Sequence, residues 1–318
     1  MALLSLLSEQ EGEFIPSWVL RERLRLTEKE LSEAVLGLRL GGYVINGSFA
    51  KGYRLGGRPD LLLPTEVLPL LRTERLGRNY VYLPTVDSTN DLAKQLARAG
   101  AVDGTLIVAE TQTGGRGRLG RSWASPPASG IWLSLILRPE LSPAELPKIT
   151  LTTAVGIARA IEAVTDLKPG IKWPNDILAE GRKICGILTE AAVGAAKTEF
   201  VIVGIGINVN TERDAFPAAL RDKAASLKGI LGRPVSRALL LAEMLRAVED
   251  VYIQLLGGEF AAIRAEWCRR TVSLGQIVHV TSPAGGFSGR AIAVTPDGAL
   301  IVSREDGLQV HVVTGEVL

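Results

Sequence analysis

Histidine is the scarcest chemistry-bearing side chain in this chain of 318 residues: only His279 and His311 occur, both near the C-terminus. Cysteine is equally rare, with Cys185 and Cys268 alone. A zinc site takes three or four His, Cys or carboxylate ligands, and a Ser–His or Cys–His pair needs a histidine beside its nucleophile. Neither arrangement is visible. An enzyme built from this chain would therefore work by positioning and positive charge, which suits reactions of phosphates and carboxylates.

Long apolar runs are missing as well. No run reaches the roughly 18 residues that a membrane-spanning helix needs. The first residues, MALLSLLSEQEGE, lack the basic start of a signal peptide and soon become acidic. The two cysteines build no disulfide framework. We therefore expect a cytoplasmic protein without a membrane partner.

Charge of one sign is not in excess either. The chain has 36 basic and 34 acidic side chains, a net charge of +2, so any contact with nucleic acid must rest on a local patch. Hydrophobic residues make up 47% of the chain, enough for a sizeable core. This length predicts two or three domains.

The first 63 residues predict three helices followed by a hairpin. Thr27 and Glu30 form a capping-box pattern, Ser17 is the expected cap of a helix through Leu24, and Asn46-Gly47 is a strong signal for a tight turn between short strands. The apolar positions expected to face the core are Leu3, Leu4, Leu6, Leu7, Leu31, Ala34, Val35 and Leu38. Three helices and a hairpin are the plan of a winged helix-turn-helix. A plain three-helix cap has the same helical periodicity.

The stretch GGRPDLLLPTEVLPLL (56–71) is the predicted linker, which divides a domain 1–63 from a domain 64–270. In the second domain, residues 171–178 and 183–192 flank a Glu180-Gly181 turn in a hairpin. Hairpins joined directly predict a mixed or antiparallel sheet with helices on it. Further strands are expected at 81–84, 105–110, 131–138 and 200–210, and helices at about 88–100, 146–165 and 236–256.

The last residues, 271–318, alternate like strands and contain the turn pairs Asp297-Gly298 and Asp306-Gly307. They predict a small, SH3-like β domain.

The most unusual segment runs from Gln112 to Trp123. Three arginines and four glycines fall within residues 112–121, with no acidic side chain. Glycines let backbone N–H groups curl around an anion, and arginines give bidentate contacts to carboxylate and phosphate. Trp123 is suited to stacking on a flat ring. The alternative, a solvated basic or RNA-binding loop, is usually longer and flanked by disorder.

A second polar segment surrounds a Trp-Pro turn. Lys172 and Asp176 bracket this turn, and Lys183 lies past the hairpin in a largely apolar strand. A lone lysine there is typical of an exposed edge strand, but this one shares its hairpin with another lysine and an aspartate. Asp176 is suited to hold magnesium on phosphates, or to pair with an arginine.

Two weaker signals complete the set. Residues 87–90, DSTN, stand at a helix start, where free N–H groups favour anions, although such a segment is often an ordinary cap. Residues 204–208, GIGIN, resemble a dinucleotide motif only superficially, because the third glycine is missing and no helix is expected after them.

Together the motifs DSTN, QTxGRGRxGRxW, KWPND, RKxxGIL and GxGxN resemble the biotin–protein ligase family in order and spacing. The similarity covers nearly the whole chain, and the combination is specific. The layout is similar to that of bifunctional ligases that also repress biotin genes. It implies an α+β protein with an N-terminal winged helix-turn-helix, a central mixed-sheet core resembling class II synthetases, and a C-terminal SH3-like domain.

The resemblance also implies roles for single residues. Positions matching the biotin pocket are Ser88, Thr89, Asn90, Gln112, Gly115, Arg116, Gly117, Arg118, Lys183, Gly186 and Gly204, with Gln112 at the reacting end. Positions matching the ATP or adenylate site are Arg118, Arg121, Trp123, Lys172, Asn175, Asp176, Lys183 and Asn208, with Asp176 as a magnesium ligand. The implied catalytic residues are Lys183, Arg118 and Arg116.

The implied reaction uses ATP, biotin and Mg²⁺. Biotin becomes biotinyl-AMP as pyrophosphate leaves, and a lysine of a biotin carboxyl carrier protein then takes the biotin. Biotin carboxylate and the ATP α-phosphate repel each other, so Arg116, Arg118 and Lys183 would hold them together and stabilise developing charge. This chemistry needs no histidine.

The repressor role implies operator DNA as a partner and a homodimer promoted by the adenylate. The matching DNA-contact positions are Thr27, Lys29, Ser32, Glu33 and Leu36 on the third helix and Lys51 and Arg54 on the wing. Residues 1–63 depart from this expectation, since they carry eight basic and eight acidic side chains. Attraction to phosphates is therefore weak, and useful affinity requires two joined copies.

Three other functions are compatible with parts of the sequence. A lipoate or octanoyl ligase shares the core fold, but the arginine-glycine loop and the β C-domain favour biotin. A biotin-sensing repressor without catalysis would need the pocket but not the charged residues. A nucleic-acid-binding module built on the loop is disfavoured by the near-neutral charge.

Overall fold

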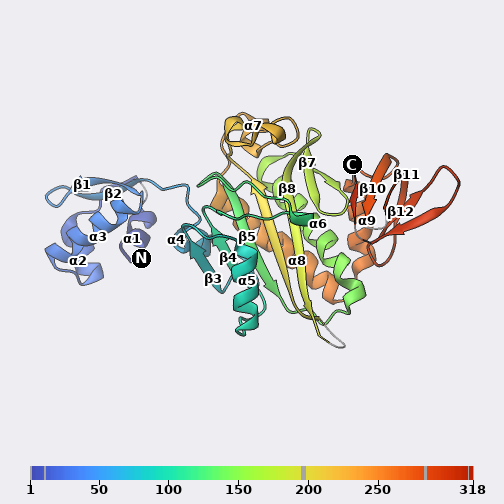
Figure 1. The fold of residues 1–318 in the computed structure, drawn as a ribbon. Coiled ribbons are helices and arrows are strands. Elements are labelled where there is room, and N and C mark those ends of the chain that lie inside the picture. The colour runs from blue at the N-terminus through green and yellow to red at the C-terminus, as the bar shows by residue number, and fades with distance from the viewer. Residues whose placement is uncertain (1, 11, 195–197, 283–284, 314, 318) are drawn as a thin grey trace. The chain divides into compact units, whose positions relative to one another are not determined.

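A computed structural model describes residues 2–10, 12–194, 198–282, 285–313 and 315–317. The chain forms two compact units, residues 1–61 and residues 62–318, coloured from blue to red along the chain in Figure 1. The break falls two residues before the predicted boundary at 63. Each unit is described by itself.

The first unit consists of three helices and a two-stranded antiparallel sheet. Its elements are α1 (Ala2–Glu9), α2 (Ser17–Leu24), α3 (Glu28–Leu40), β1 (Val44–Ser48) and β2 (Gly52–Gly57). Leu7, Leu20 and Leu31 are fully buried between them. The predicted capping box is confirmed, because Thr27 and Glu30 exchange both hydrogen bonds at the start of α3.

Two local predictions for this unit are wrong. Asn46-Gly47 lies inside β1, opposite Arg54 and Tyr53, and the chain reverses over residues 49–51 instead. A Cβ on Gly47 would overlap the carbonyl of Gly52, so the glycine permits close approach of two strands rather than a turn. Ser17 is the first residue of α2, after Pro16 at the cap, and its hydroxyl donates to Phe49 O at 2.7 Å.

The second unit is built on a seven-stranded sheet. Its order is β3 (Tyr80–Leu83), β4 (Thr105–Ala109), β5 (Gly130–Leu137), β9 (Thr198–Asn208), β8 (Arg182–Val193), β7 (Asp176–Ala179) and β6 (Gly170–Lys172). Only the β3–β4 pair is parallel, which confirms the predicted mixed sheet. The strand predicted at 171–178 is divided into β6 and β7, which pair with each other, and Lys172 and Asp176 bracket the turn between them, as predicted. Proline at 174 cannot donate a ladder hydrogen bond.

Helices cover both faces of this sheet (Figure 1). The helix α5 (Thr89–Arg98) packs on one face over Ile107, Ile136, Phe200 and Ile202. The other face meets a larger core with α6 (Leu146–Thr165) and α8 (Arg237–Leu256). Shorter helices are α4 (Pro64–Val67), α7 (Leu227–Leu231) and α9 (Phe260–Arg270). No described helix is long and apolar enough to cross a bilayer.

The predicted linker is only partly a linker. Residues Pro64–Val67 form α4, and Leu62 and Val67 are fully buried in the core of the second unit. The Leu62 N–H donates to Glu110 Oε1 at 2.6 Å, and Tyr80 Oη donates to Leu62 O at 2.8 Å. The prolines predicted a linker, but from Leu62 onward the burial of apolar side chains fixes the segment in the second unit.

The C-terminal residues form a five-stranded antiparallel sheet, as expected for a small β domain. Its order is β13 (Gln309–Val312), β12 (Leu300–Ser303), β11 (Gly285–Val294), β10 (Ile277–Ser282) and β14 (Glu316–Val317). Val280, Leu300 and Val302 join the core that lies beneath α6 and α8. This sheet is therefore positioned against the rest of the second unit by shared apolar packing.

Candidate functional site

A cavity of about 490 Å³ opens on the sheet face that carries α5. On β9, Phe200 and Ile202 pack under α5, and Gly204 and Gly206 continue the same face because alternate strand residues share a face. Gly206 is paired with Gly186 on β8. Beyond the N-terminal end of α5, this face of the sheet therefore carries glycines in place of side chains, and a ligand can lie close to the backbone.

Neighbouring side chains need these glycines. A Cβ on Gly204 would overlap the amide of Asn90. A Cβ on Gly206 would lie 2.5 Å from the Trp123 ring, and one on Gly186 would lie 2.8 Å from it. The indole therefore rests on the paired glycines, while Asn90 lies over the third. Trp123 Nε1 is buried and has no hydrogen-bond partner among the described residues.

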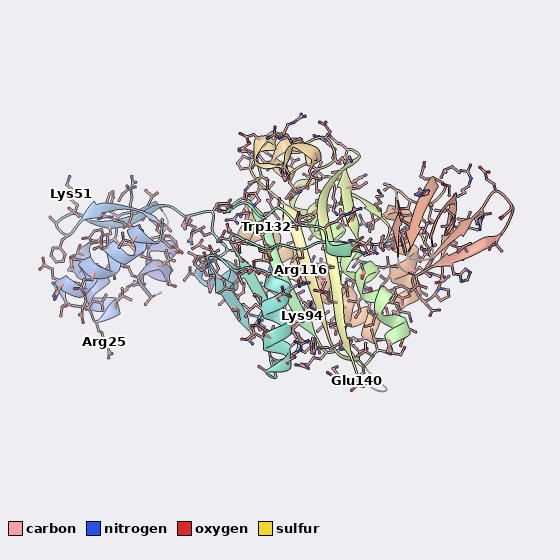
Figure 2. All side chains as sticks on the ribbon, viewed as in Figure 1. Arg25, Lys51, Lys94, Arg116, Trp132 and Glu140 are labelled. Carbon is pink, nitrogen blue, oxygen red and sulfur yellow. The ribbon has the colours of Figure 1, made fainter. Side chains whose placement is uncertain are left out.

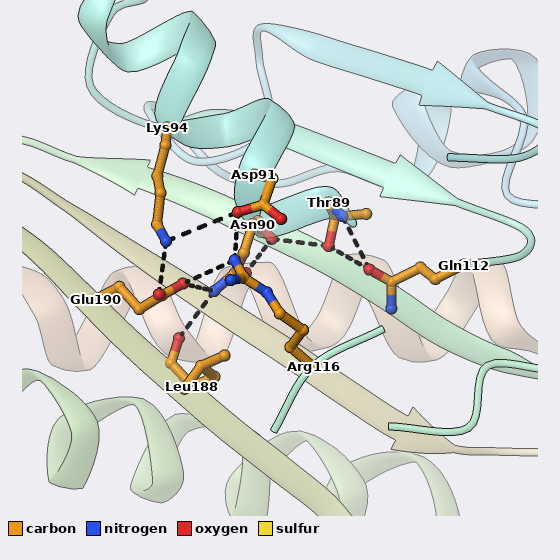
Figure 3. A network of polar contacts seen from close by, with 9 residues as sticks. Thr89, Asn90, Asp91, Lys94, Gln112, Arg116, Leu188 and Glu190 are labelled. Atoms are coloured by element: carbon orange, nitrogen blue, oxygen red, sulfur yellow. Dashed lines mark hydrogen bonds and ion pairs between the residues drawn. The ribbon is translucent and has the colours of Figure 1, made fainter. Parts of the chain in front are cut away.

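One end of the cavity is a buried polar cluster at the start of α5. Thr89 N donates to Gln112 Oε1 at 2.9 Å, Thr89 Oγ1 lies 3.0 Å from the same oxygen, and Gln112 Nε2 donates to Ser125 Oγ at 3.0 Å. Ser134 Oγ lies 2.5 Å from Asn90 Oδ1 and 2.8 Å from Thr89 Oγ1. Figure 3 shows Thr89, Asn90 and Gln112 of this cluster above the sheet. Gln112 therefore lies with Thr89, and its predicted contact with the reacting end stays a prediction.

The other end is cationic. Lys183 Nζ lies 2.6 Å from Asp176 Oδ1 and 5.3 Å from the centre of the Trp123 ring. Arg118 donates to Asn175 Oδ1 at 2.9 Å and to the carbonyl of Gly315 at 2.8 Å. The residue just before β14 thus helps to fix one arginine of the cavity.

Loop residues before β10 and between β11 and β12 support the Trp-Pro turn. Trp173 N donates to Ser273 Oγ at 2.9 Å, and its Nε1 donates to Gly298 O at 3.3 Å. The Trp173–Pro174 peptide bond is cis. Asn175 is held by its Nδ2 donating to Ile187 O at 2.8 Å.

The arginine-glycine loop folds back on itself. Trp123 N donates to Gly115 O at 2.8 Å, and Gly117 N donates to Arg121 O at 2.7 Å. Leu119 at its tip is 70% exposed. Arg116, between these bonds, turns toward Asp91 and Glu190.

The structure brings nearly all predicted site residues to one cavity. Its lining includes Ser88, Thr89, Asn90, Gln112, Arg116, Gly117, Arg118, Arg121, Trp123, Lys172, Asn175, Asp176, Lys183, Gly186, Gly204 and Asn208. Gly115 is not part of the lining, and a Cβ there would lie 2.5 Å from Trp123 O, so it shapes the loop.

Sequence reasoning missed several lining residues. They include Gly206, Phe216, Leu220, Asp222 and Lys223. The sequence could have indicated that Gly206 lines the cavity, because this glycine stands two residues after Gly204 in an apolar strand. The others lie in an irregular segment, which reaches the cavity because Lys183 N donates to Lys223 O and Ala225 N donates to Lys183 O.

Two titratable groups on the strand β8, beside the cavity, have shifted pKa values. Burial opposes the charge of Glu190, but hydrogen bonds from Lys94 and Asn90 outweigh it and lower the pKa of that carboxyl. Burial raises the pKa of Cys185 far above its usual range, so this residue is not a thiolate nucleophile. In the described part of the chain, no group of three or more His, Cys, Asp or Glu side chains gathers as a metal site.

The predicted DNA-contact residues lie on the surface of the first unit. Lys29, Ser32, Glu33 and Leu36 are exposed on α3, and Lys29 pairs with Glu33 at 3.8 Å. Lys51 and Arg25 project from the ribbon in Figure 2. Arg54 is half-buried over the Phe14 ring and donates to Gly12 O at 3.2 Å. Thr27 is engaged in its capping box.

Comparison with known proteins gives clear sequence matches. Residues 82–208 match the Biotin/lipoate A/B protein ligase family, and residues 273–318 match the Biotin protein ligase C terminal domain. The Bifunctional ligase/repressor BirA of Bacillus spizizenii is 36% identical over 307 residues, covering 96% of this chain and 94% of that protein. The Biotin--[acetyl-CoA-carboxylase] ligase of Mycobacterium tuberculosis is 34% identical, covering 62% of this chain and 73% of that protein.

A solved structure agrees. The biotin protein ligase from Aquifex aeolicus in complex with biotin and ATP superposes with a TM-score of 0.65 at 28% identity, covering 77% of this chain and 98% of that one. Sequence motifs, cavity and comparisons converge, and the chain belongs to the biotin protein ligase family.

Proposed function

We propose that this protein uses ATP to convert biotin to biotinyl-AMP and then transfers the biotin to a lysine of a carrier protein. One observation carries the proposal: a single cavity joins a polar cluster, buried Thr89 and Asn90 with half-buried Gln112, to a cationic end with Lys183 and Arg118. Biotin has a polar ring at one end and a carboxylate at the other, so it matches this distribution.

The cationic end suits the first step. A biotin carboxylate oxygen attacks the α-phosphate of ATP, an O–P bond forms, and pyrophosphate leaves. Lys183 and Arg118 would offset the repulsion between the two anions and stabilise the charge on the transferred phosphoryl group. Each is already held, Lys183 by Asp176 and Arg118 by Asn175, so little reorganisation is required.

The adenosine part would lie toward Trp123. The buried indole N–H of Trp123 has no hydrogen-bond partner among the described residues, and an acceptor atom of the ligand would provide one. Asn208 is the last residue of β9, and its Nδ2 donates to Ala225 O at 3.1 Å. Arg121 and Lys172 line the cavity and are suited to the phosphates.

Magnesium also fits this end. Mg²⁺ in nucleotide sites takes one or two carboxylates, with phosphates and water completing its shell. Asp176 is a cavity carboxylate close to Lys183, and it would be the protein ligand. The ion would neutralise charge on the departing pyrophosphate.

In the second step the carrier lysine attacks the biotinyl carbonyl, an amide forms, and AMP leaves. The adenylate is a reactive mixed anhydride, so the loop of residues 115–121 would exclude water until the carrier binds. Leu119 at the loop tip suits an apolar cover.

We further propose that the first unit is a winged helix-turn-helix, part of a three-domain layout, that represses transcription on operator DNA as a homodimer. The order α1, α2, α3, β1, β2 fits this plan. A relative named ligase/repressor aligns over 96% of the chain, which must include most of residues 1–61. The weak charge of α3 favours binding by two joined copies.

The ligase proposal is tested by pyrophosphate release. Purified protein is incubated with MgATP and either biotin, lipoate or octanoate. Release with biotin alone, followed by labelling of an added carrier domain, is expected. Pyrophosphate release only with lipoate or octanoate would show that one of those acids, not biotin, is the substrate. Biotin binding without pyrophosphate release would indicate a biotin sensor without catalysis.

The repressor proposal is tested by a gel shift. DNA from upstream of the chain's own biotin genes is mixed with protein, with and without biotin and ATP. A shift that requires both ligands, and that weakens as salt rises, is expected. No ligand-dependent shift at low salt would falsify the repressor role and leave the ligase role intact.

A further inference from the structure

A network of two carboxylates and two cations lies directly behind the polar end of the cavity (Figure 3). Glu190 of β8 accepts from Lys94 Nζ at 2.6 Å and from Asn90 Nδ2 at 2.8 Å. Arg116 of the loop hydrogen-bonds to Asp91 and lies 3.8 Å from Glu190. Glu190 does not line the cavity, so it acts on any ligand only through these neighbours.

Glu190 fixes the orientation of the Asn90 amide. A carboxylate only accepts hydrogen bonds, so Asn90 must turn its NH₂ toward Glu190. Its carbonyl oxygen then faces Ser134 Oγ at 2.5 Å. The pKa of Glu190 is lowered, which keeps this group an acceptor at neutral pH.

The orientation propagates to the cavity wall. Ser134 has one hydroxyl proton, and donating it to Asn90 leaves Ser134 Oγ as an acceptor toward Thr89 at 2.8 Å. The Thr89 proton is then directed at Ser134 or at Gln112, both protein groups. A Thr89 lone pair remains for an N–H donor in the cavity.

We infer that Glu190 is a positioning residue that sets the hydrogen-bond polarity of the Asn90–Ser134–Thr89 chain for a ligand ring bearing N–H donors, and that it anchors Arg116 of the loop by charge. The inference rests on the proposed function, since the biotin ring carries such donors. One carboxylate thereby couples ring recognition to the position of the loop.

The three side chains in this series of hydrogen bonds are buried, so a hydrogen bond in the wrong direction is costly. Asn90, Ser134 and Thr89 are each less than 5% exposed. A buried donor facing a donor costs the desolvation of both groups, because no water reaches them to repair the mismatch. A glutamine at position 190 both donates and accepts, so it no longer dictates which way Asn90 turns.

The test is a double-mutant cycle on biotin affinity by calorimetry, with Glu190→Gln, Ser134→Ala and the double variant. Each single change is expected to weaken biotin about 10-fold, the effect of roughly one misdirected buried hydrogen bond. The double variant should be no more than about threefold weaker than the worse single one, because both changes break one chain.

Controls separate this role from damage to the fold. Glu199→Gln makes the same change on the paired strand, at an exposed side chain, and should bind biotin like the parent. Thermal unfolding checks each variant, and the KM for ATP at saturating biotin should move less than twofold. If Glu190→Gln does not fold, Glu190→Ala replaces it in the cycle, since it too removes the acceptor-only group that orients Asn90.

Folded variants that bind biotin within twofold of the parent, or a double variant weakened about 100-fold by independent effects, would overturn the role of Glu190. A parent that binds no biotin would overturn the proposed function instead. The two failures are therefore distinguishable.

Discussion

Lys183 and Asp176 form an ion pair across the β7–β8 hairpin, with Nζ and Oδ1 2.6 Å apart. Their side chains are only 32% and 24% exposed, so the pair is partly withdrawn from solvent. In the proposed mechanism both partners turn to the substrates, the lysine to anionic oxygens and the aspartate to magnesium. The pair holds two oppositely charged groups ready at the point where carboxylate and phosphate would meet.

Replacing Lys183 by alanine is expected to slow biotinyl-AMP synthesis by about 10²-fold or more, because one preorganised charge at the reacting atoms is lost. Pyrophosphate release under single-turnover conditions measures the effect. Lys168→Ala, an exposed lysine beyond α6, is the matched control and should retain parental activity. Adenylation by Lys183→Ala within twofold of the parent would remove this lysine from the mechanism.

Replacing Gly206 by alanine is expected to displace the Trp123 ring, because the new Cβ would start 2.5 Å from it. We expect the KM for ATP to rise at least 10-fold, since about 1.4 kcal/mol of binding corresponds to that factor. Gly257→Ala, where the nearest atoms lie at 3.5 Å, serves as control. An unchanged KM would place the adenine away from Trp123.

Biotin with ATP is expected to protect the loop of residues 115–121 from trypsin, which cleaves after arginine. Ligand oxygens would add contacts to Arg116 and Arg118, while cleavage after exposed Arg233 should not change. Arg118→Gly removes the bonds to Asn175 and to Gly315, so the adenylate should escape and label bystander lysines. Equal loop cleavage with and without ligands would contradict closure.

Acid is expected to weaken the contact between α6 and α9. Hydrogen bonds from Arg159, together with Arg270, lower the pKa of Glu266 from 4.5 to about 2 against the effect of burial. Because the folded-state pKa lies below the unfolded value, this stabilisation is complete above about pH 4.5 and is lost as pH falls toward 2. Glu266→Gln should lower the unfolding temperature at pH 7 and flatten its decline below pH 4.5.

The measurement is thermal unfolding by circular dichroism from pH 7 to pH 2. Glu305→Gln, at an exposed carboxylate in the turn between β12 and β13, should follow the parent curve at every pH. A parallel fall for Glu266→Gln and parent below pH 4.5 would show that other groups dominate.

Local signals predicted the parts of the structure that local physics decides. The capping box at Thr27 and Glu30 begins α3, the apolar periodicity over 146–165 is α6, and the turn at Glu180-Gly181 carries two positive φ angles of 50° and 75°. The motif residues were also predicted to gather at one site, although family resemblance, not periodicity, supplied that expectation.

Contacts between residues far apart in the sequence could not be predicted from these local signals. Arg116 was expected on the ligand, yet its observed partners are Asp91 and Glu190, the latter 74 positions away. Phe216 reaches the cavity through backbone bonds between Lys183 and the residues around Lys223. Asn46-Gly47 gave a turn signal, but glycine serves close strand approach equally well. Pairwise geometry of this kind leaves no periodic trace in a sequence.

The strand β9 carries core side chains at its start and the glycines of the cavity further along, all on one face. A pairing slip of one residue would turn Ile205 toward the cavity and Gly204 and Gly206 toward the main core. The pocket would fill, and the core would gain voids where Val203 and Ile205 now pack. Ligand affinity is therefore a measure of strand alignment: a destabilised variant that still binds must have kept β9 in register.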